Sequence, residues 1–418
     1  MQKEINLPKI NIHRLRNIIL VLLISTGVFI AGYYIGANGY PQGSDAYVKA
    51  DVDKGLPSNK KNVDFGLFWR VWDTLEGQYF DKTKLDPSMM VYGAIQGMVG
   101  AVGDPYTVFL PPQENKVVQE DLKGSFQGVG IQIGFLGTQL AVVAPLPDTP
   151  AAEAGIQAGD HIIGIKDEAK EVDTSTAGMS LPDAVELIRG PAGSIVTLAL
   201  VREGEDQPII VDVERREINV PSVLLTWEGE NKDIAHVRLL KFAGETEDEW
   251  EAVVRDVLKN RNLSGIVLDL RNNPGGYLQG AVDIAGEFLP NGTLVVIEES
   301  ADKTRREFKT DRIPRLSDIP MILLVNKGSA SASEILSGAL RDQAGIKVVG
   351  VTTFGKGTIQ EPQQFEDGTG LHITTARWIT PSEFWVNDVG MEPDVVIEDD
   401  LETEDDEQLY EAINNLFI

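Results

Sequence analysis

A serine in the sequence "KGSASASEIL" (residues 327–336) has surroundings that suit nucleophilic chemistry. Ser331, the middle of three serines, precedes Glu334 by three residues, which is the pattern of a capping box at a helix start. Such a pattern by itself is usually structural. Here, however, the loop follows a predicted apolar strand, small residues leave room for a substrate backbone, and the free amides of a helix start can stabilise an oxyanion. Ser331 is therefore a candidate nucleophile.

A serine nucleophile needs a base, and a lysine is the best candidate in this sequence. Lys356 follows an apolar strand in "VVGVTTFGKGTIQ" (348–360) and lies between two glycines, which let the chain bend sharply. Packing against apolar strand ends would lower the pKa of its amine, and only the neutral amine can accept a proton. Gln360, four residues further on, could orient that amine.

Histidine is the usual partner of a catalytic serine, and the chain has four. His236 and His372 alternate with apolar residues in predicted strands, which favours structural or solvent-facing positions. No histidine has a loop context that places it beside Ser331. A histidine-dependent hydrolase stays open as the weaker alternative.

The loop "RNNPGG" (271–276) follows another apolar strand. One interpretation is a simple turn, because Asn, Pro and Gly favour turns. The other is that Gly275 or Gly276 presents a backbone amide to a developing oxyanion. The residue types and their spacing leave the two interpretations about even.

Both loops belong to a region, residues 218–397, in which apolar strands alternate with helices. This alternation predicts a parallel sheet covered on both faces, with "GTLVVIE" (292–298) and "PMILLVN" (320–326) among its strands. Ligand sites in such sheets lie beyond the carboxyl ends of the strands, which is where both loops occur.

The segments before this region predict two further domains. Residues 63–122 are expected to be helical, with the apolar stripe of Phe65, Phe68, Trp69, Trp72 and Leu75 in a core. Residues 123–217 contain short strands with glycine-rich turns and predict a small mixed domain. An acidic run and a short helix, residues 398–418, follow the α/β region.

The N-terminus predicts a membrane anchor. Residues 18–36 are 19 residues without a charge, which is long enough to span a bilayer as a helix. Basic residues in the preceding segment, 1–17, and acidic ones after it place the bulk of the chain outside the cytoplasm. A cleaved signal peptide is the competing interpretation. Residues 37–62 are predicted to be a linker.

The composition limits the function classes. A net charge of −27 argues against nucleic-acid binding, which needs a basic surface. The absence of cysteine excludes disulfides, thiolate metal sites and cysteine nucleophiles. The predicted chemistry requires no metal and no other cofactor.

The motifs "GSASASEILSGAL" and "FGKGTIQ" resemble those of the carboxyl-terminal processing peptidases, the tail-specific proteases of serine peptidase family S41. In that family the middle serine is the nucleophile, and a lysine 25 residues later is the base; Lys356 follows Ser331 by 25 residues. The resemblance implies that Gln360 is the third residue and that a glycine of "RNNPGG" forms the oxyanion hole with the amide of Ala332. It extends from about Phe65 to Ile397, and the family suggests no role for the segment after it.

The resemblance also extends to a PDZ domain in residues 123–217, through "KGSFQGVGIQI" and "IRGPAGS". Such a domain binds a peptide as an added strand and captures its terminal carboxylate with backbone amides. The matching loop contains Gly128, Val129, Gly130 and Ile131. Arg189 resembles an arginine that in some relatives links peptide binding to activation.

We therefore expect a multidomain α+β and α/β protein: an N-terminal transmembrane helix, a helical segment, a PDZ domain and a crotonase-like α/β protease core. The expected function is a membrane-anchored serine endopeptidase of a bacterial cell membrane, single-pass, with its catalytic domain outside the cytoplasm. Its partners would be protein substrates bound by their C-terminal ends, with a homodimer possible. A PDZ adaptor or scaffold with a catalytically weak protease core is the alternative.

Overall fold

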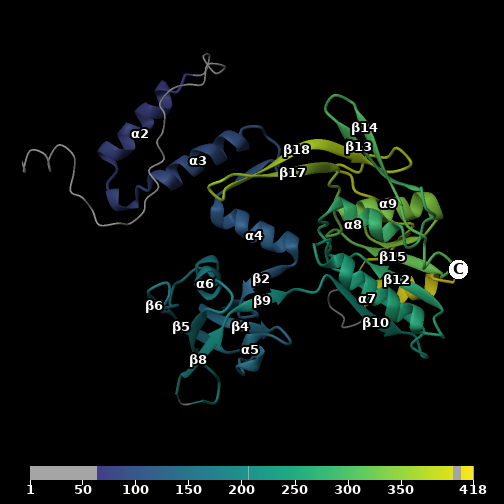
Figure 1. Cartoon of the computed structure of the whole chain (residues 1–418), viewed down its shortest axis with the longest axis horizontal. Coiled ribbons are helices and arrows are strands. Elements are labelled where there is room, and N and C mark those ends of the chain that lie inside the picture. Colours follow the sequence, from purple (N-terminus) through teal and green to yellow (C-terminus); the bar gives the residue numbers. More distant parts are fainter. Residues whose placement is uncertain (1–63, 206, 399–405, 418) are drawn as a thin grey trace, which may run out of the picture. The chain divides into compact units, whose positions relative to one another are not determined.

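The computed structural model describes residues 64–205, 207–398 and 406–417 (Figure 1). The chain divides into two compact units, residues 1–85 and 86–418. Within the described ranges, no helix combines the length and the apolar character that crossing a bilayer requires. The predicted anchor, residues 18–36, lies outside the described residues.

In the first unit, helix α2 (Gly66–Gln78) carries the predicted aromatic stripe, followed by a 3-10 turn, η2 (Lys82–Lys84). The expectation that this stripe lies in a core is wrong, because α2 has no buried residue. The rings instead contact one another: Phe68 packs edge-on against Trp69 with centroids 5.0 Å apart, and Trp72 lies 5.9 Å from Phe68. A helical apolar stripe becomes a core only where another element covers it.

The second unit begins with helix α3 (Pro87–Gly100), strand β1 (Val108–Leu110) and helix α4 (Pro112–Lys123). The carboxylate of Asp86 caps α3 by accepting from the amides of Ser88 and Met89. Sequence analysis predicted helices throughout this stretch and missed β1. This short strand pairs antiparallel with β18 (Gly370–Ile379), more than 250 residues later in the chain, and a partner that remote leaves no local signal.

A strand-rich domain was predicted between the helical segment and the α/β region, and strands β2 to β9 form one. Its sheet has the order β3 (Ile131–Leu136), β4 (Gln139–Pro145), β5 (His161–Asp167), β7 (Ile195–Val201) and β8 (Ile209–Glu214), with β6 (Val172–Ser175) beside β5. Strand β2 (Ser125–Gly128) pairs with β9 (Arg216–Asn219), where the chain enters and leaves the domain. Two helices, α5 (Pro150–Glu153) and α6 (Leu181–Ile188), complete it. Strand β3 lies at an edge of the sheet, and α6 lies against it.

The α/β region is built on a six-stranded sheet of order β10 (Val223–Glu228), β11 (Ile234–Leu239), β12 (Gly265–Asp269), β15 (Met321–Val325), β16 (Val348–Gly350) and β19 (Val395–Val396). All neighbouring pairs except β10–β11 are parallel. The prediction of a parallel sheet covered on both faces is confirmed except at the β10 edge, where the pairing is antiparallel.

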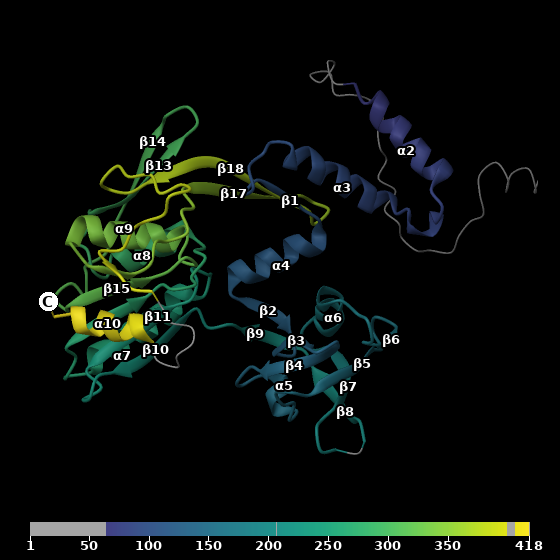
Figure 2. The same ribbon diagram turned by 180° about the vertical axis from the view of Figure 1, so that it is seen from behind.

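Alternate residues of these strands point to two apolar layers, which explains why the strands are apolar throughout. One layer contains residues such as Leu268 and Leu323 and packs with helices α7 (Thr246–Lys259), α8 (Leu278–Ala285) and α9 (Ala332–Ala344). The other contains residues such as Val267 and Leu324 and is covered by the C-terminal helix α10 (Glu407–Asn415), drawn in yellow in Figure 2.

A second, antiparallel sheet was not predicted. Its order is β1, β18, β13 (Leu294–Ser300) and β14 (Arg305–Lys309), with β17 (Thr358–Gln364) also paired to β18. The run "GTLVVIE" therefore belongs to this sheet and not to the parallel one. A short apolar run predicts a buried strand but not its partner. This sheet contributes the strand that follows Lys356.

Candidate active site

A cavity of about 350 Å³ lies between the parallel sheet, the second sheet and helix α4. Ser331, Lys356 and Gln360, which were selected from the sequence, all line it. The glycines of the "RNNPGG" loop line it as well, as do Val118, Asp121 and Leu122 of α4. Segments more than 200 residues apart therefore meet at one site.

Ser331 lies at the junction of β15 and α9 with a backbone conformation unusual for a residue that is not glycine, φ 54° and ψ −113°. Such a conformation costs about 1–3 kcal/mol and persists only where the surroundings enforce it. The Ser331 amide donates to Glu334 Oε2 at 2.8 Å, which is one half of the predicted capping box. The capping box is present, and the hydroxyl of Ser331 faces the amide of the third helical residue without making a side-chain cap hydrogen bond.

Glu334 connects the serine loop to the lysine loop. Its side chain is fully buried and accepts four hydrogen bonds. Oε2 accepts from the amides of Ser331 (2.8 Å) and Lys356 (3.0 Å), and Oε1 accepts from the amide of Gly355 (2.7 Å) and the hydroxyl of Thr353 (2.6 Å). One carboxylate therefore sets the distance between the backbones of the candidate nucleophile and the candidate base.

The backbone of Lys356 is held on its other side as well, because its carbonyl accepts from Trp378 Nε1 at 2.7 Å. Its ammonium nitrogen lies over the ring of Tyr106, 4.9 Å from the centroid. Burial lowers the pKa of Lys356 below its usual range, and the carboxylates of Asp104 and Glu334 offset part of this effect. Within the described residues the amine donates no hydrogen bond.

Gln360 and His372 differ from the expectation in their contacts. Gln360 Nε2 donates to the hydroxyls of Thr358 (2.8 Å) and Thr374 (3.1 Å), not to Lys356. His372, expected to be structural or solvent-facing, lines the cavity from β18. Burial and the charge of Lys356 lower its pKa. Alternation along a strand shows which residues share a face, but not what that face meets.

The loop after β12 packs directly against the serine loop. A Cβ on Gly275 (φ 99°) would lie 2.8 Å from the carbonyl oxygen of Ala330 and 2.9 Å from Ser331 Cβ, so only glycine fits there. The Gly275 amide donates to Asn273 Oδ1 at 2.9 Å. Among the described residues, the amides of Gly276 and Ala332 have no acceptor. Of the two candidate glycines, Gly276 is thus the one with a free amide.

The sequence of this chain is similar to known proteins in both of the regions described above. The model of peptidase family S41 matches residues 233–397, and a PDZ domain model matches residues 142–202. The carboxy-terminal processing protease CtpB of Bacillus subtilis is 31% identical over 374 residues, which are 88% of this chain and 74% of that protein. The chain belongs to the S41 carboxy-terminal processing proteases.

One further relative agrees with this assignment, and one solved structure shows the same fold. A carboxy-terminal-processing protease of Bartonella bacilliformis is 34% identical over 349 residues, covering 82% of this chain and 78% of that protein. The solved structure of an S41 protease from Bacteroides fragilis shares the fold, with a TM-score of 0.50, 16% identity and coverage of 78% and 89% of the two chains. The chain is accordingly a serine peptidase of the C-terminal processing class with a PDZ domain.

The PDZ loop predicted to bind a carboxylate begins where β2 ends. Gly128, Val129 and Gly130 are buried, and Gly130 has a positive φ of 79°. The carbonyl of Gly130 accepts from the amide of Leu146 and from the hydroxyl of Thr149. The loop leads into Ile131 at the start of the edge strand β3, so a peptide added to β3 would extend toward it.

Arg189, at the end of α6, contacts helix α4. Its guanidinium donates to Glu120 at 2.9 Å and lies 4.4 Å from the centroid of the Phe126 ring. Helix α4 lines the protease cavity with neighbouring residues, among them Val118 and Asp121. One helix therefore contacts both the PDZ domain and the catalytic cavity.

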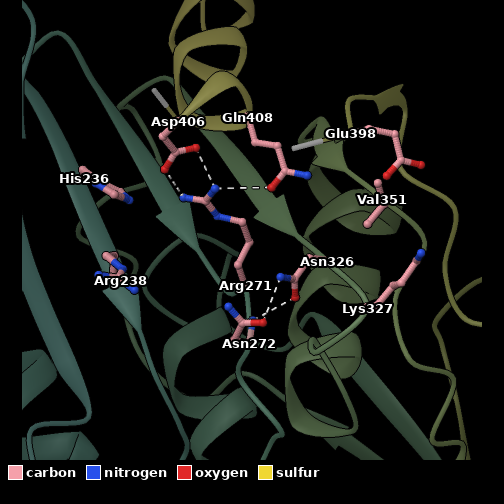
Figure 3. A pocket seen from close by; sticks show the side chains of 10 residues that line it. All are labelled: His236, Arg238, Arg271, Asn272, Asn326, Lys327, Val351, Glu398, Asp406 and Gln408. Atoms are coloured by element: carbon pink, nitrogen blue, oxygen red, sulfur yellow. Dashed lines mark hydrogen bonds and ion pairs between the residues drawn. The ribbon is translucent and has the colours of Figure 1, made fainter. Parts of the chain in front are cut away.

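A second cavity of about 470 Å³ lies at the carboxyl ends of the parallel strands, on the side of the sheet that α10 covers (Figure 3). His236, expected to be structural or solvent-facing, lines it. Its Nδ1 lies 3.3 Å from the hydroxyl of Thr226, and its Nε2 lies 3.1 Å from a carboxylate oxygen of Asp269. His236 lines this second cavity and not the one with Ser331.

Sequence analysis missed Tyr106 and Asp104, which approach Lys356 from the segment before β1. Asp104 closes a turn there by accepting from the amide of Tyr106 (3.0 Å) and the hydroxyl of Thr107 (2.6 Å). The string "GDPYT" carries the signal of such a turn. Nothing local in it indicates a lysine 250 residues later in the chain.

We predict that Glu334→Gln abolishes most of the activity, by about a hundredfold or more. The amide nitrogen of Gln would face two donors, either the amides of Ser331 and Lys356 or the amide of Gly355 and the hydroxyl of Thr353. Each buried donor left without an acceptor costs about 1–3 kcal/mol. The measurements are cleavage of a reduced, unfolded model protein and the melting temperature. Glu361→Gln, an exposed acid on β17, is the control and should change neither; full activity in Glu334→Gln would refute the role of this carboxylate.

Proposed function

We propose that this chain is a membrane-anchored endopeptidase that recognises protein C-termini through its PDZ domain and cleaves with a Ser331–Lys356 dyad. The observation that carries the proposal is that one buried carboxylate, Glu334, holds the backbones of both residues at the mouth of a single cavity. The lowered pKa of Lys356 supports it.

In the proposed reaction, neutral Lys356 takes the proton of Ser331 as Oγ attacks the peptide carbonyl carbon. The amides of Ala332 and Gly276 stabilise the oxyanion. Collapse of this intermediate breaks the C–N bond, and the leaving amine takes the proton back from Lys356. Water then attacks the acyl ester with Lys356 again as the base, which releases the second product and restores Ser331.

Lys356 must move for this to happen. Over the Tyr106 ring its charged form is favoured, because the negative face of an aromatic ring attracts a cation. We propose that substrate entering the cavity turns the amine from Tyr106 toward Ser331, where Gln360 can orient it if its amide leaves Thr358 and Thr374. The contact of Arg189 with Glu120 on α4 offers a route by which PDZ ligand binding reaches the cavity.

The histidine alternative gains one observation, because His372 lines the cavity. Its lowered pKa leaves it neutral and able to accept a proton. We therefore predict that Lys356→Ala loses activity by about a thousandfold or more, as Ser331→Ala does, while His372→Ala stays within about tenfold of wild type. Cleavage of an unfolded model protein, with folding checked by circular dichroism, measures this. The reverse ranking would identify histidine as the base. Activity in both variants would exclude both bases, and absence of cleavage by the wild type would favour the adaptor alternative.

We predict that the ring of Tyr106 sets the pH dependence. The charged groups facing Lys356 are Asp104 and Glu334, with Tyr106 and His372 beside them. Tyr106→Leu removes a contact worth about 0.5–2 kcal/mol to the ammonium, so the pKa of Lys356 falls. Activity requires the neutral amine and rises with pH, so the acid limb of kcat/KM should shift about half a unit to one and a half units lower.

The matched control for this pH profile is Tyr106→Phe, which keeps the aromatic face and should retain the wild-type midpoint. If Tyr106→Leu and Tyr106→Phe have the same midpoint, the ring does not act on Lys356.

Residues 18–36 are proposed to anchor the chain in a bacterial membrane, with the protease outside the cytoplasm. Full-length protein should therefore sediment with membranes and resist carbonate extraction, and deletion of residues 1–36 should release it. Recovery of the full-length chain in the soluble fraction would contradict the anchor, and recovery of a shortened chain would favour a cleaved signal peptide.

A further inference from the structure

The C-terminal helix α10 follows the part of the chain that the S41 model matches, which ends at residue 397. Its apolar face packs on the parallel sheet on the side opposite α7–α9. The residues of this layer are Ala412 and Leu416, with Leu409 and Ile413 beside them, against Ile234, Val267, Ile322, Leu324 and Val349. Apolar packing therefore holds α10 in place. Its polar N-terminal end reaches the loop that begins at Arg271.

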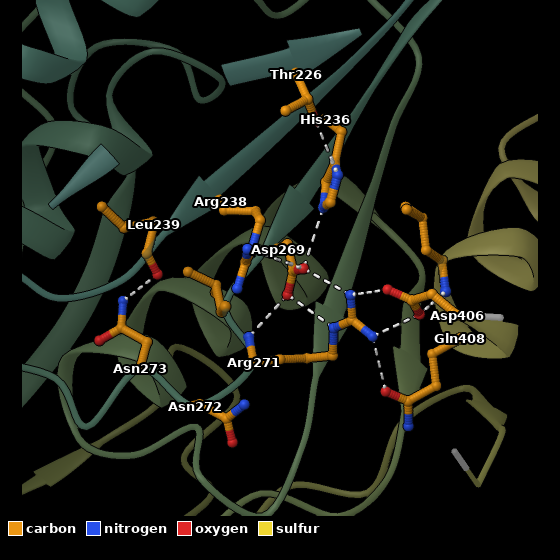
Figure 4. A network of polar contacts seen from close by, with 12 residues as sticks. Thr226, His236, Arg238, Leu239, Asp269, Arg271, Asn272, Asn273, Asp406 and Gln408 are labelled. Carbon is orange, nitrogen blue, oxygen red and sulfur yellow. Dashed lines mark hydrogen bonds and ion pairs between the residues drawn. The ribbon is translucent and has the colours of Figure 1, made fainter. Parts of the chain in front are cut away.

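Arg271, the first residue of the "RNNPGG" loop, lies between two carboxylates (Figure 4). Its Nη1 and Nη2 donate to the two oxygens of Asp406, each at 2.7 Å. Its Nε and Nη2 donate to the two oxygens of Asp269, at 3.0 and 2.8 Å. The guanidinium side chain is only 13% exposed. Two-point pairing of this kind restricts the direction of an arginine as well as its distance.

Both carboxylates are themselves fixed. Asp269, at the end of β12, is buried and also accepts from the backbone amide of Arg271 at 2.9 Å. Asp406 is the N-cap of α10, where it accepts from the amide of Leu409 at 2.8 Å. Burial would raise the pKa of both carboxyls, but hydrogen bonds from His236 and Arg271 lower the pKa of Asp269 to about 2. Hydrogen bonds from Arg271 and the Leu409 amide lower the pKa of Asp406, so both are charged at neutral pH.

The residues after Arg271 are hydrogen-bonded to the serine loop. Asn272 and Asn326 exchange two bonds, at 2.8 and 3.0 Å. The carbonyl of Asn273 accepts from the amide of Ala330 (3.0 Å) and the hydroxyl of Ser333 (3.0 Å). The oxyanion loop and the loop bearing Ser331 thus form one connected unit, and Arg271 attaches that unit to α10.

The outer side of this unit faces the second cavity. Arg271, Asn272 and Asp406 border the second cavity, and Figure 3 shows Arg271 extending across it from the loop to Asp406. A side chain beside an open cavity lacks the close contacts that fix residues in a core. The paired charges supply the restraint there.

We infer that α10 is a working part of the protease site: Asp406 fixes Arg271, and Arg271 fixes the loop that presents the Gly276 amide. Asp406 and Arg271 are positioning residues that do not touch the substrate. This inference rests on the proposed Ser–Lys mechanism for its effect on turnover, although the restraint on the loop is measurable without turnover. It assigns a role to a segment that neither the family model nor the sequence motifs explain.

The decisive variant is Asp406→Asn, because Asn and Asp cap helices equally well, so α10 keeps its cap while the charge that pairs with Arg271 is lost. We expect kcat for a fluorogenic peptide with an apolar C-terminus to fall about tenfold or more with KM unchanged. Labelling of Ser331 by a phosphonate should slow by a similar factor. Glu411→Gln is the matched control: it lies on the same helix, away from Arg271, and keeps its contact with Asn415.

Hydrogen exchange provides the readout that is independent of activity. Amides of residues 271–276 should exchange faster in Asp406→Asn than in wild type or Glu411→Gln. Arg271→Lys, which keeps the charge but cannot bridge two carboxylates, should show the same kcat loss and faster exchange, and serves if Asp406→Asn folds poorly. Wild-type kcat together with wild-type exchange in these variants would overturn the inference and leave α10 as a cover of the sheet.

If the wild-type chain neither cleaves the peptide nor is labelled by the phosphonate, the proposed function fails. The exchange of residues 271–276 still decides whether Asp406 restrains the loop.

Discussion

The site depends on one buried carboxylate, that of Glu334. An isolated buried charge would be strongly unfavourable, and this one is tolerated because four donors surround it. Those donors come from the serine loop and from the segment Thr353–Lys356, which begins 22 residues after Ser331 in the chain. The same pairing enforces the unusual backbone of Ser331, since its amide must point at Glu334. The capping box of Ser331 and Glu334 thereby connects the serine loop to the lysine loop.

Around Glu334, each of the two sheets supplies one wall of the cavity. The carboxyl ends of the parallel strands supply the serine loop and the oxyanion loop, as expected for an open α/β sheet. The antiparallel sheet supplies the other wall, with Gln360 on β17 and His372 on β18. Trp378 of β18 donates to the Lys356 carbonyl and so ties the lysine loop to this second sheet. The cavity exists because both sheets pack beside α9.

The two faces of the parallel sheet also have different roles. The face toward α7–α9 carries the helix start with the proposed nucleophile Ser331, and the face toward α10 carries His236, Asp269 and the Arg271 ion pairs. A buried ion pair is weak evidence for stability, because desolvation offsets much of the attraction. Its geometric constraint is the stronger reason to place two carboxylates around one arginine. The loop 271–276, at the carboxyl end of β12, is held on one side by the serine loop and on the other by α10.

Much of the fold could be predicted from the sequence. The alternation of apolar strands with helices determined the mostly parallel sheet, because strands buried on both faces are apolar throughout. The family resemblance carried by the spacing of Ser331 and Lys356 predicted the proposed chemistry, and "RNNPGG" offered Gly275 and Gly276 as candidate oxyanion donors. The short run Leu294–Ser300 was placed in the wrong sheet, and the aromatic stripe of α2 was placed in a core that it does not enter. Periodicity reports which face is apolar, not what covers it.

What the sequence by itself determined is the set of reactive residue types and the local elements that carry them, because caps, turns and strand ends depend on near neighbours. The tertiary structure alone decided that Tyr106 lies over Lys356, that Gly276 rather than Gly275 keeps a free amide, and that Asp406 holds Arg271. Each of these contacts joins separate segments or depends on the exact direction of one amide. Their partners are selected by packing across the whole molecule, and such long-range choices leave no period or motif in the chain.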